Sequence, residues 1–197
     1  MAERSPILQA FLDALEITIL DLSDAGSDHA RVTKKMFAAL AEPGPQTPRQ
    51  RTENPACAHI QPVLDTAENI QSVKVLTAAF RALEPEIAWS ARADRRTDDP
   101  NFPNAHATGM IIGDGGLEAR QDLRMGASLL APETFYPNHQ HPPEEVYIAL
   151  SPGNWRQEAG PWREPGIGGL VYNPPNIIHA MQSDTSALLA IWMLPPS

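Results

Sequence analysis

The second half of the chain is a series of short apolar segments separated by glycine and proline, and this spacing limits the fold more than any other feature. Strands that follow one another so closely leave no room for the helices that connect parallel strands, so they favour an antiparallel sandwich or barrel. The segments are Ala107–Gly113, Leu123–Leu130, Val146–Leu150, Leu170–Tyr172, Ile177–Met181 and Ala187–Leu194.

The first hundred residues carry a helical pattern instead. Ser5 followed by Pro6 is typical of a helix start, and apolar residues then recur at three- and four-residue spacing over residues 7–15. Two further amphipathic stretches cover residues 32–40 and 73–83. We therefore expect a mainly β protein with an α-helical N-terminal half.

The polar segment 92–103 is the clearest internal boundary. We predict a helical extension over residues 1–104 that packs on a β-barrel over residues 105–197, the two forming one elaborated domain. Twenty prolines in 197 residues are about twice the average share of about 5%. They predict many turns and argue against long uninterrupted helices.

Charge and apolar content exclude several classes of partner. The net charge of −9 gives no basic surface for nucleic acid or an anionic membrane. The strongest apolar run, Ala187–Leu194, is far shorter than the roughly twenty residues that span a bilayer. The single cysteine, Cys57, cannot form an internal disulfide, and the first residues lack the pattern of a signal peptide, so we expect a cytoplasmic protein.

Histidine, glutamate and tyrosine gather at one place in the strand half. In an extended strand, residues two apart share a face, so His139 and His141 point the same way, and Glu145 and Tyr147 do too. The two prolines between these pairs would let the chain bend, and His179 would arrive from a distant strand. Imidazole and carboxylate together suit one divalent transition metal ion, with zinc, iron and manganese all open.

The spacing resembles that of the cupin superfamily. The residues that match its first motif are His139-x-His141-x3-Glu145-x7-Gly153. Those that match its second motif are Gly168-x5-Pro174-x-Asn176-x2-His179. This resemblance implies a small, jelly-roll-like antiparallel barrel that holds one metal ion in its mouth. The first motif has one extra residue before Gly153, and Glu133 and Asn176 stand where glycine is usual.

With Tyr136 and Tyr147 added, the chain is similar to the Q-type dimethylsulfoniopropionate lyases of marine bacteria. That resemblance implies that His141, Glu145 and His179 bind the metal and that Tyr147 is the catalytic base. It also implies that Tyr136 and His139 line the substrate pocket. His139 and Tyr147 are further candidate ligands.

The implied substrate is a small zwitterion with a carboxylate and a sulfonium cation. Aromatic faces attract such cations, so Trp155 and Trp192 join the candidate substrate-binding residues. The expected reaction is a metal-dependent β-elimination that gives dimethyl sulfide and acrylate. Two alternatives remain open: a cupin oxygenase that acts on a small organic acid or thiol, and a cupin that binds a small molecule without catalysis. The sequence also leaves a homo-oligomer open.

Overall fold

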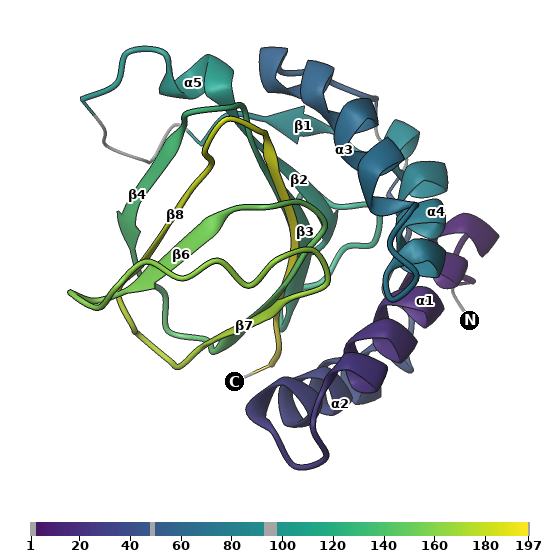
Figure 1. The fold of residues 1–197 in the computed structure, drawn as a ribbon. Helices are drawn as coiled ribbons and strands as arrows, with labels where there is room; N and C mark the ends of the chain where they lie inside the picture. Colours follow the sequence, from purple (N-terminus) through teal and green to yellow (C-terminus); the bar gives the residue numbers. More distant parts are fainter. Residues whose placement is uncertain (1–2, 48–49, 93–97, 197) are drawn as a thin grey trace.

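The computed structural model describes residues 3–47, 50–92 and 98–196. Its second half forms two antiparallel sheets that face each other and enclose a barrel (Figure 1). Helices of the first half lie in an arc over the outer face of the larger sheet (Figure 1). The expected antiparallel barrel with an α-helical N-terminal half is therefore confirmed.

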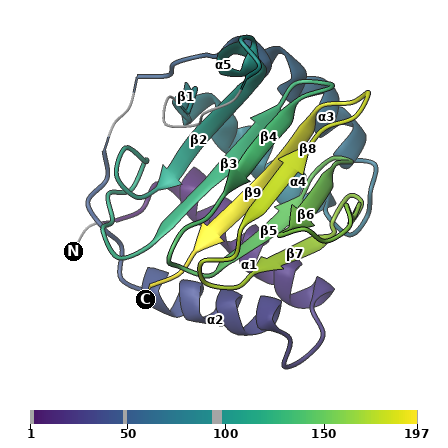
Figure 2. The same ribbon diagram turned by 90° about the vertical axis from the view of Figure 1, so that its left-hand side faces the viewer.

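Nine strands lie in the described part of the chain. They are β1 (Trp89–Ser90), β2 (His106–Ile112), β3 (Arg124–Leu130), β4 (Phe135–His139), β5 (Glu145–Ala149), β6 (Asn154–Gln157), β7 (Leu170–Asn173), β8 (His179–Gln182) and β9 (Leu188–Leu194). The larger sheet has the order β1-β2-β3-β9-β5-β7, and the smaller sheet has the order β4-β8-β6 (Figure 2).

The helices are α1 (Pro6–Leu22), α2 (Asp28–Leu40), α3 (Ile60–Ala67), α4 (Lys74–Leu83) and the short α5 (Phe102–Ala105). Helix α1 begins as predicted, because the Ser5 side chain accepts a hydrogen bond from the Leu8 amide at 3.2 Å. The expectation of short helices was wrong for α1, which has 17 residues. No proline stands between Pro6 and Pro43, so nothing interrupts this helix.

The central strands are buried on both faces, which explains their almost continuous apolar sequences. In β9, alternate side chains such as Leu189, Ile191 and Met193 join the core under the helices. Their neighbours Leu188, Ala190 and Trp192 belong to a second core inside the barrel. The larger sheet is thus a shared wall between the helical layer and the barrel interior.

Besides the short β1 and α5, three elements have no counterpart in the predicted segments. Strand β6 has one buried residue, Trp155, and so lacks an apolar run. Strand β4 carries Pro137 and polar residues, and α3 contains Pro62 in its first turn. Because these elements contain proline or few apolar residues, apolar periodicity does not predict them.

Three described residues other than glycine, Glu133, Glu158 and Asn176, take the left-handed backbone that glycine favours. Glu133 has φ 57° and Asn176 has φ 60°, and these are the positions where the cupin motifs commonly carry glycine. The Asn176 amide donates to the His141 carbonyl oxygen at 2.9 Å. This bond joins the loop before β8 to the loop after β4, and both loops lead to the candidate site.

The helical half also contributes to the larger sheet. Strand β1 pairs with β2 in the register Trp89↔Gly109, and Ile87 and Trp89 belong to the core that the helices share with the sheet. The division of the chain at residue 104 stays a prediction. None of the described helices has the length and apolar character needed to cross a membrane.

Candidate metal centre

Three side chains converge at one end of the barrel, and they come from both sheets. His141 follows β4, and His179 is the first residue of β8, which pairs with β4 in the smaller sheet. Glu145 is the first residue of β5 in the larger sheet. The chain crosses from one sheet to the other at Pro142 and Pro143, which allows the histidines to face the glutamate.

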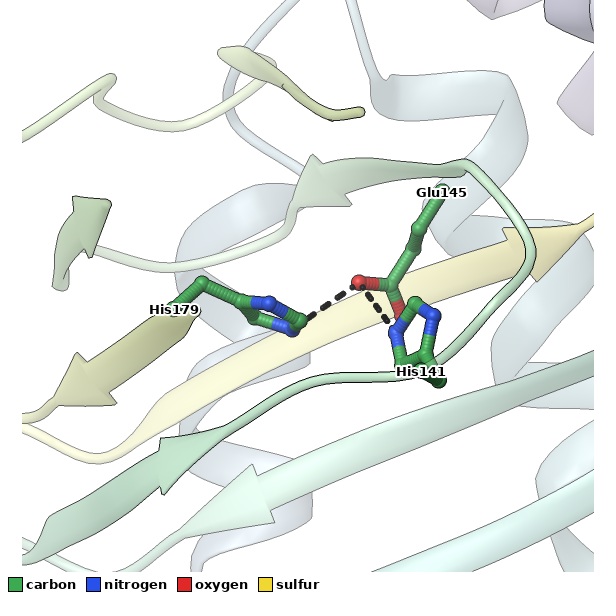
Figure 3. Close-up of side chains that lie close together, drawn as sticks. All are labelled: His141, Glu145 and His179. Carbon is green, nitrogen blue, oxygen red and sulfur yellow. Dashed lines mark hydrogen bonds and ion pairs between the residues drawn. The ribbon is translucent and has the colours of Figure 1, made fainter. Parts of the chain in front are cut away.

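The Glu145 carboxylate lies between the two imidazole rings (Figure 3). Its Oε2 atom is 3.3 Å from His141 Nε2 and 3.2 Å from His179 Nε2. One ligand atom from each residue lies within 4.8 Å of the other two. Among the described residues, this is the cluster whose histidine and carboxylate atoms are close enough to share one metal ion.

Backbone carbonyl groups orient both rings. His141 Nδ1 is 2.8 Å from the Pro143 carbonyl oxygen, and His179 Nδ1 is 3.0 Å from the Ile177 carbonyl oxygen. A carbonyl oxygen only accepts, so in each ring Nδ1 carries the proton and donates it. In the neutral histidines, Nε2 then presents its lone pair toward Glu145, which is the orientation of a metal-binding imidazole.

The charges at this point fit a bound cation. Burial raises the pKa of Glu145, but hydrogen bonds and charge interactions with protonated His141 and His179 outweigh burial and lower it below its ordinary value, so the carboxylate is ionised. His179 is only 1% exposed, and its Nε2 has no hydrogen-bond partner within the described part of the chain. A divalent ion would take the place of the two Nε2 protons, and two imidazole lone pairs and the carboxylate oxygen would then converge on it.

A small cavity of about 50 Å³ adjoins the cluster. His141 and Glu145 line it together with four residues singled out in the sequence: Tyr136, His139, Tyr147 and Trp192. Both tyrosines and Trp192 are buried, and the His139 ring lies 4.0 Å from the His179 ring, measured between centroids. The structure therefore places these candidate residues around one small cavity.

Trp155 lies apart from that group. It belongs to the barrel interior, with its ring 6.2 Å from the Tyr147 ring, but it does not line the cavity at the metal cluster. It lines a different cavity of about 510 Å³ beside β6 and β7. Its role in substrate binding stays a prediction.

Sequence reasoning missed several polar residues of the site. Asn173 is fully buried and donates to Glu145 Oε2 at 2.9 Å. Thr108, Ser128 and Arg92 also line the cavity. Isolated polar residues within strands carry no spacing signal, and only the register of the sheet brings them to the site.

Glu144, which directly precedes Glu145, is more buried than the alternation of strand faces predicts. Alternation along β5 predicts an exposed side chain, yet this one is only 12% exposed. It forms an ion pair with Arg31 of α2 at 2.6 Å and accepts a hydrogen bond from Tyr172 at 3.1 Å. Helix α2 covers this face of the strand, so the residue that precedes Glu145 is tied to the helical layer.

Comparison with known proteins points to one family. The curated protein named dimethylsulfoniopropionate lyase DddQ, from Ruegeria pomeroyi, is 28% identical over 159 residues, which cover 79% of this chain and 77% of that protein. The protein named putative dimethylsulfoniopropionate lyase DddL, from Cereibacter sphaeroides, is 28% identical over 167 residues, which cover 80% of this chain and 68% of that protein.

A solved structure shares the fold of this chain. The crystal structure of the DMSP lyase DddQ from Ruegeria pomeroyi superimposes with a TM-score of 0.68 at 21% identity, covering 98% of this chain and 93% of that one. The family model for dimethylsulfoniopropionate lyase matches residues 28–190, a range that includes the whole metal cluster. This chain therefore belongs to the dimethylsulfoniopropionate lyase family, whose named members are carbon–sulfur lyases.

Proposed function

We propose that this protein cleaves dimethylsulfoniopropionate to dimethyl sulfide and acrylate by a metal-dependent β-elimination. The observation that carries the proposal is the cluster of His141, Glu145 and His179 beside a small cavity that Tyr147 also lines. Family membership supports the substrate and the reaction. The arrangement of the side chains supports the mechanism.

In this mechanism His141, Glu145 and His179 hold one divalent ion. When bound, the ion acts as a Lewis acid that stabilises the negative charge developing on the substrate carboxylate. Zinc, iron and manganese all accept two imidazoles and a carboxylate, so we propose a transition metal without choosing among them. His139 and Tyr147, which line the same cavity, are candidates for additional ligands.

Tyr147 acts as the base. Its phenolate oxygen accepts the proton from the carbon next to the substrate carboxylate, and a nearby cation favours the ionised phenol that this step requires. The electron pair of that carbon–hydrogen bond forms the new double bond of acrylate. The carbon–sulfur bond breaks at the same time, and its electron pair leaves on sulfur as neutral dimethyl sulfide.

Aromatic side chains hold the other end of the substrate. Tyr136 and Trp192 line the cavity and are buried at 3% and 6% exposure, so their faces would meet the sulfonium group away from water. Such contacts contribute roughly 0.5–2 kcal/mol each. His139 completes the wall between Tyr136 and His179. Trp155 would act through its packing against the Tyr147 ring, because it does not line the cavity.

The test is to give the purified protein dimethylsulfoniopropionate and to quantify both products, in air and without oxygen. We expect dimethyl sulfide in the headspace and an equal amount of acrylate in solution, at the same rate in both atmospheres. Activity that vanishes without oxygen would favour the oxygenase alternative. Binding of the substrate without either product would favour a non-catalytic cupin.

A further inference from the structure

A row of two amide side chains adjoins Glu145. Asn173 of β7 is the register partner of Glu145 in β5, and it is fully buried. Its Nδ2 donates to Glu145 Oε2 at 2.9 Å, a shorter contact than those of either histidine with the same oxygen. The carboxylate is thus held by a side chain of the neighbouring strand.

Gln157 of β6 holds Asn173 in turn. Its Nε2 donates to Asn173 Oδ1 at 2.8 Å and to the Tyr172 carbonyl oxygen at 2.7 Å. Strands β6 and β7 are the end strands of the two different sheets. The Gln157 side chain therefore bridges the two sheet edges immediately beside the metal cluster.

The direction of these bonds is fixed independently at both ends. The Tyr172 carbonyl oxygen only accepts, so the amide group of Gln157 must turn its nitrogen toward it. The ionised Glu145 carboxylate also only accepts, so Asn173 must turn its nitrogen toward Glu145 and its oxygen toward Gln157. The two requirements agree, and each amide has one orientation that satisfies every contact.

We propose that Gln157 and Asn173 are positioning residues that orient Glu145 for metal binding. The inference rests on the metal site of the proposed function and adds residues that touch neither the ion nor the substrate cavity. Gln157 lines the separate cavity of about 510 Å³ and not the one at the metal cluster. Hydrogen bonds of this kind, made to a ligand rather than to the ion, typically change metal affinity 10–100-fold.

The most discriminating test is the substitution Gln157→Glu. Simple electrostatics and the proposed chain of hydrogen bonds predict opposite changes in metal affinity for this variant. An added negative charge near a cation strengthens its binding by simple electrostatics. In the proposed chain of bonds, a carboxylate at position 157 cannot donate, so Asn173 turns its nitrogen away from Glu145 and presents its oxygen instead. We expect zinc affinity to fall about tenfold or more.

The measurement is a titration of metal-free protein with zinc alone, in competition with a coloured chelator. Gln157→Met removes the same donor without adding charge or forcing Asn173 to turn, so its zinc affinity should fall less. Asn173→Ala, which removes the bond to Glu145 directly, should weaken zinc binding at least as much as Gln157→Glu. The metal-free variants should keep the circular dichroism spectrum of the unchanged protein.

Unchanged or stronger zinc binding by folded Gln157→Glu would overturn the proposal, and so would a fall in Gln157→Met as large as that in Gln157→Glu. If Gln157→Glu does not fold, unchanged affinity in Asn173→Ala would overturn it equally. Because no substrate is present, these outcomes are distinct from a failure of the lyase reaction. Failure of the unchanged protein to bind zinc would overturn the inference together with the metal site.

Discussion

Tyr147 and Tyr172 are matched residues on opposite faces of one sheet. They lie on paired strands, and the register places Tyr172 beside Val146, whose side chain faces the helices. Tyr147 faces the barrel interior and lines the cavity at the metal cluster. If Tyr147 is the base, Tyr147→Phe should retain metal and lower the rate of dimethyl sulfide release by roughly 10²–10⁴-fold.

Tyr172→Phe is the control for that variant. It also removes one phenol hydroxyl, but from a bond to Glu144 whose Arg31 and Lys35 partners remain. Its rate should stay within about twofold, because a partly solvated polar contact contributes little. Full activity in Tyr147→Phe, measured in the same headspace assay, would remove Tyr147 from the role of base.

The ligand residues should behave differently from the base. His141→Ala or Glu145→Ala removes one of three converging ligand atoms, so metal content and activity should fall together. Elemental analysis of the purified variants measures the first quantity, and headspace dimethyl sulfide measures the second. His59→Ala, which changes a histidine outside the cluster, should alter neither. A Glu145→Ala variant that kept both stoichiometric metal and full activity would contradict the assignment.

Among the residues of the site, His141, Glu145 and His179 could be predicted from their spacing in the sequence. His141 and Glu145 lie on either side of a bend at two prolines, and the spacing of the second motif indicates His179. Asn173 and Gln157 could not be found in that way. Their contacts depend on which strands end each sheet and on the register between β5 and β7, and neither is visible as a local pattern.

At the level of helices and strands, one buried carboxylate joins two segments of the helical layer to the sheet. Glu118, in the connection between β2 and β3, is fully buried. It accepts from Arg4 Nε, before α1, at 2.6 Å and from the Gly44 amide, after α2, at 2.9 Å. This residue fixes two distant parts of the chain against one turn of the barrel.

Glu118→Ala should therefore destabilise the whole fold. It leaves the Arg4 guanidinium, which is only 7% exposed, without the carboxylate that pairs with it, and breaking a buried pair in this way costs about 3–5 kcal/mol. Urea unfolding followed by circular dichroism measures the loss. Asp122→Ala, which removes a carboxylate that is 49% exposed, should cost no more than about 1 kcal/mol. Equal stabilities of the two variants would contradict this view of Glu118.

Helices and central strands were predictable because their apolar side chains repeat with a helix or strand period. The predicted stretches at residues 7–15, 32–40 and 73–83 lie within or almost within α1, α2 and α4. Strand β6 was not predictable, since it is held by pairing with β8 and buries only Trp155. Its formation depends on its partner strand rather than on its own sequence.

For the whole molecule, burial of the larger sheet on both faces has a direct consequence. A fragment of residues 105–197 would expose the row that includes Val146, Ile148 and Ile191, which packs under the helices. Exposure of each such side chain removes about 1.5–3 kcal/mol of hydrophobic stabilisation. We expect the fragment to aggregate or remain unfolded, and the full chain to unfold in one calorimetric transition. Two separate transitions, or a stably folded fragment, would contradict the one-domain organisation.

The antiparallel barrel could be predicted from the sequence, whereas the order of its strands could not. Close spacing of apolar segments excludes parallel crossovers, but it does not say that β9 lies between β3 and β5. That arrangement places Trp192 between Gly126 and Tyr147, where only glycine leaves room for the indole ring. The shape of the cavity thus follows from contacts far apart in the sequence.

The central claim is that elimination depends on a metal ion held by His141, Glu145 and His179. The direct measurement is dimethyl sulfide release by protein whose metal has been removed with a chelator, before and after one equivalent of a divalent transition metal is returned. We predict that release is lost in the metal-free protein and restored with the metal, in air and without oxygen alike. Release at the full rate by protein shown to be metal-free by elemental analysis would contradict it.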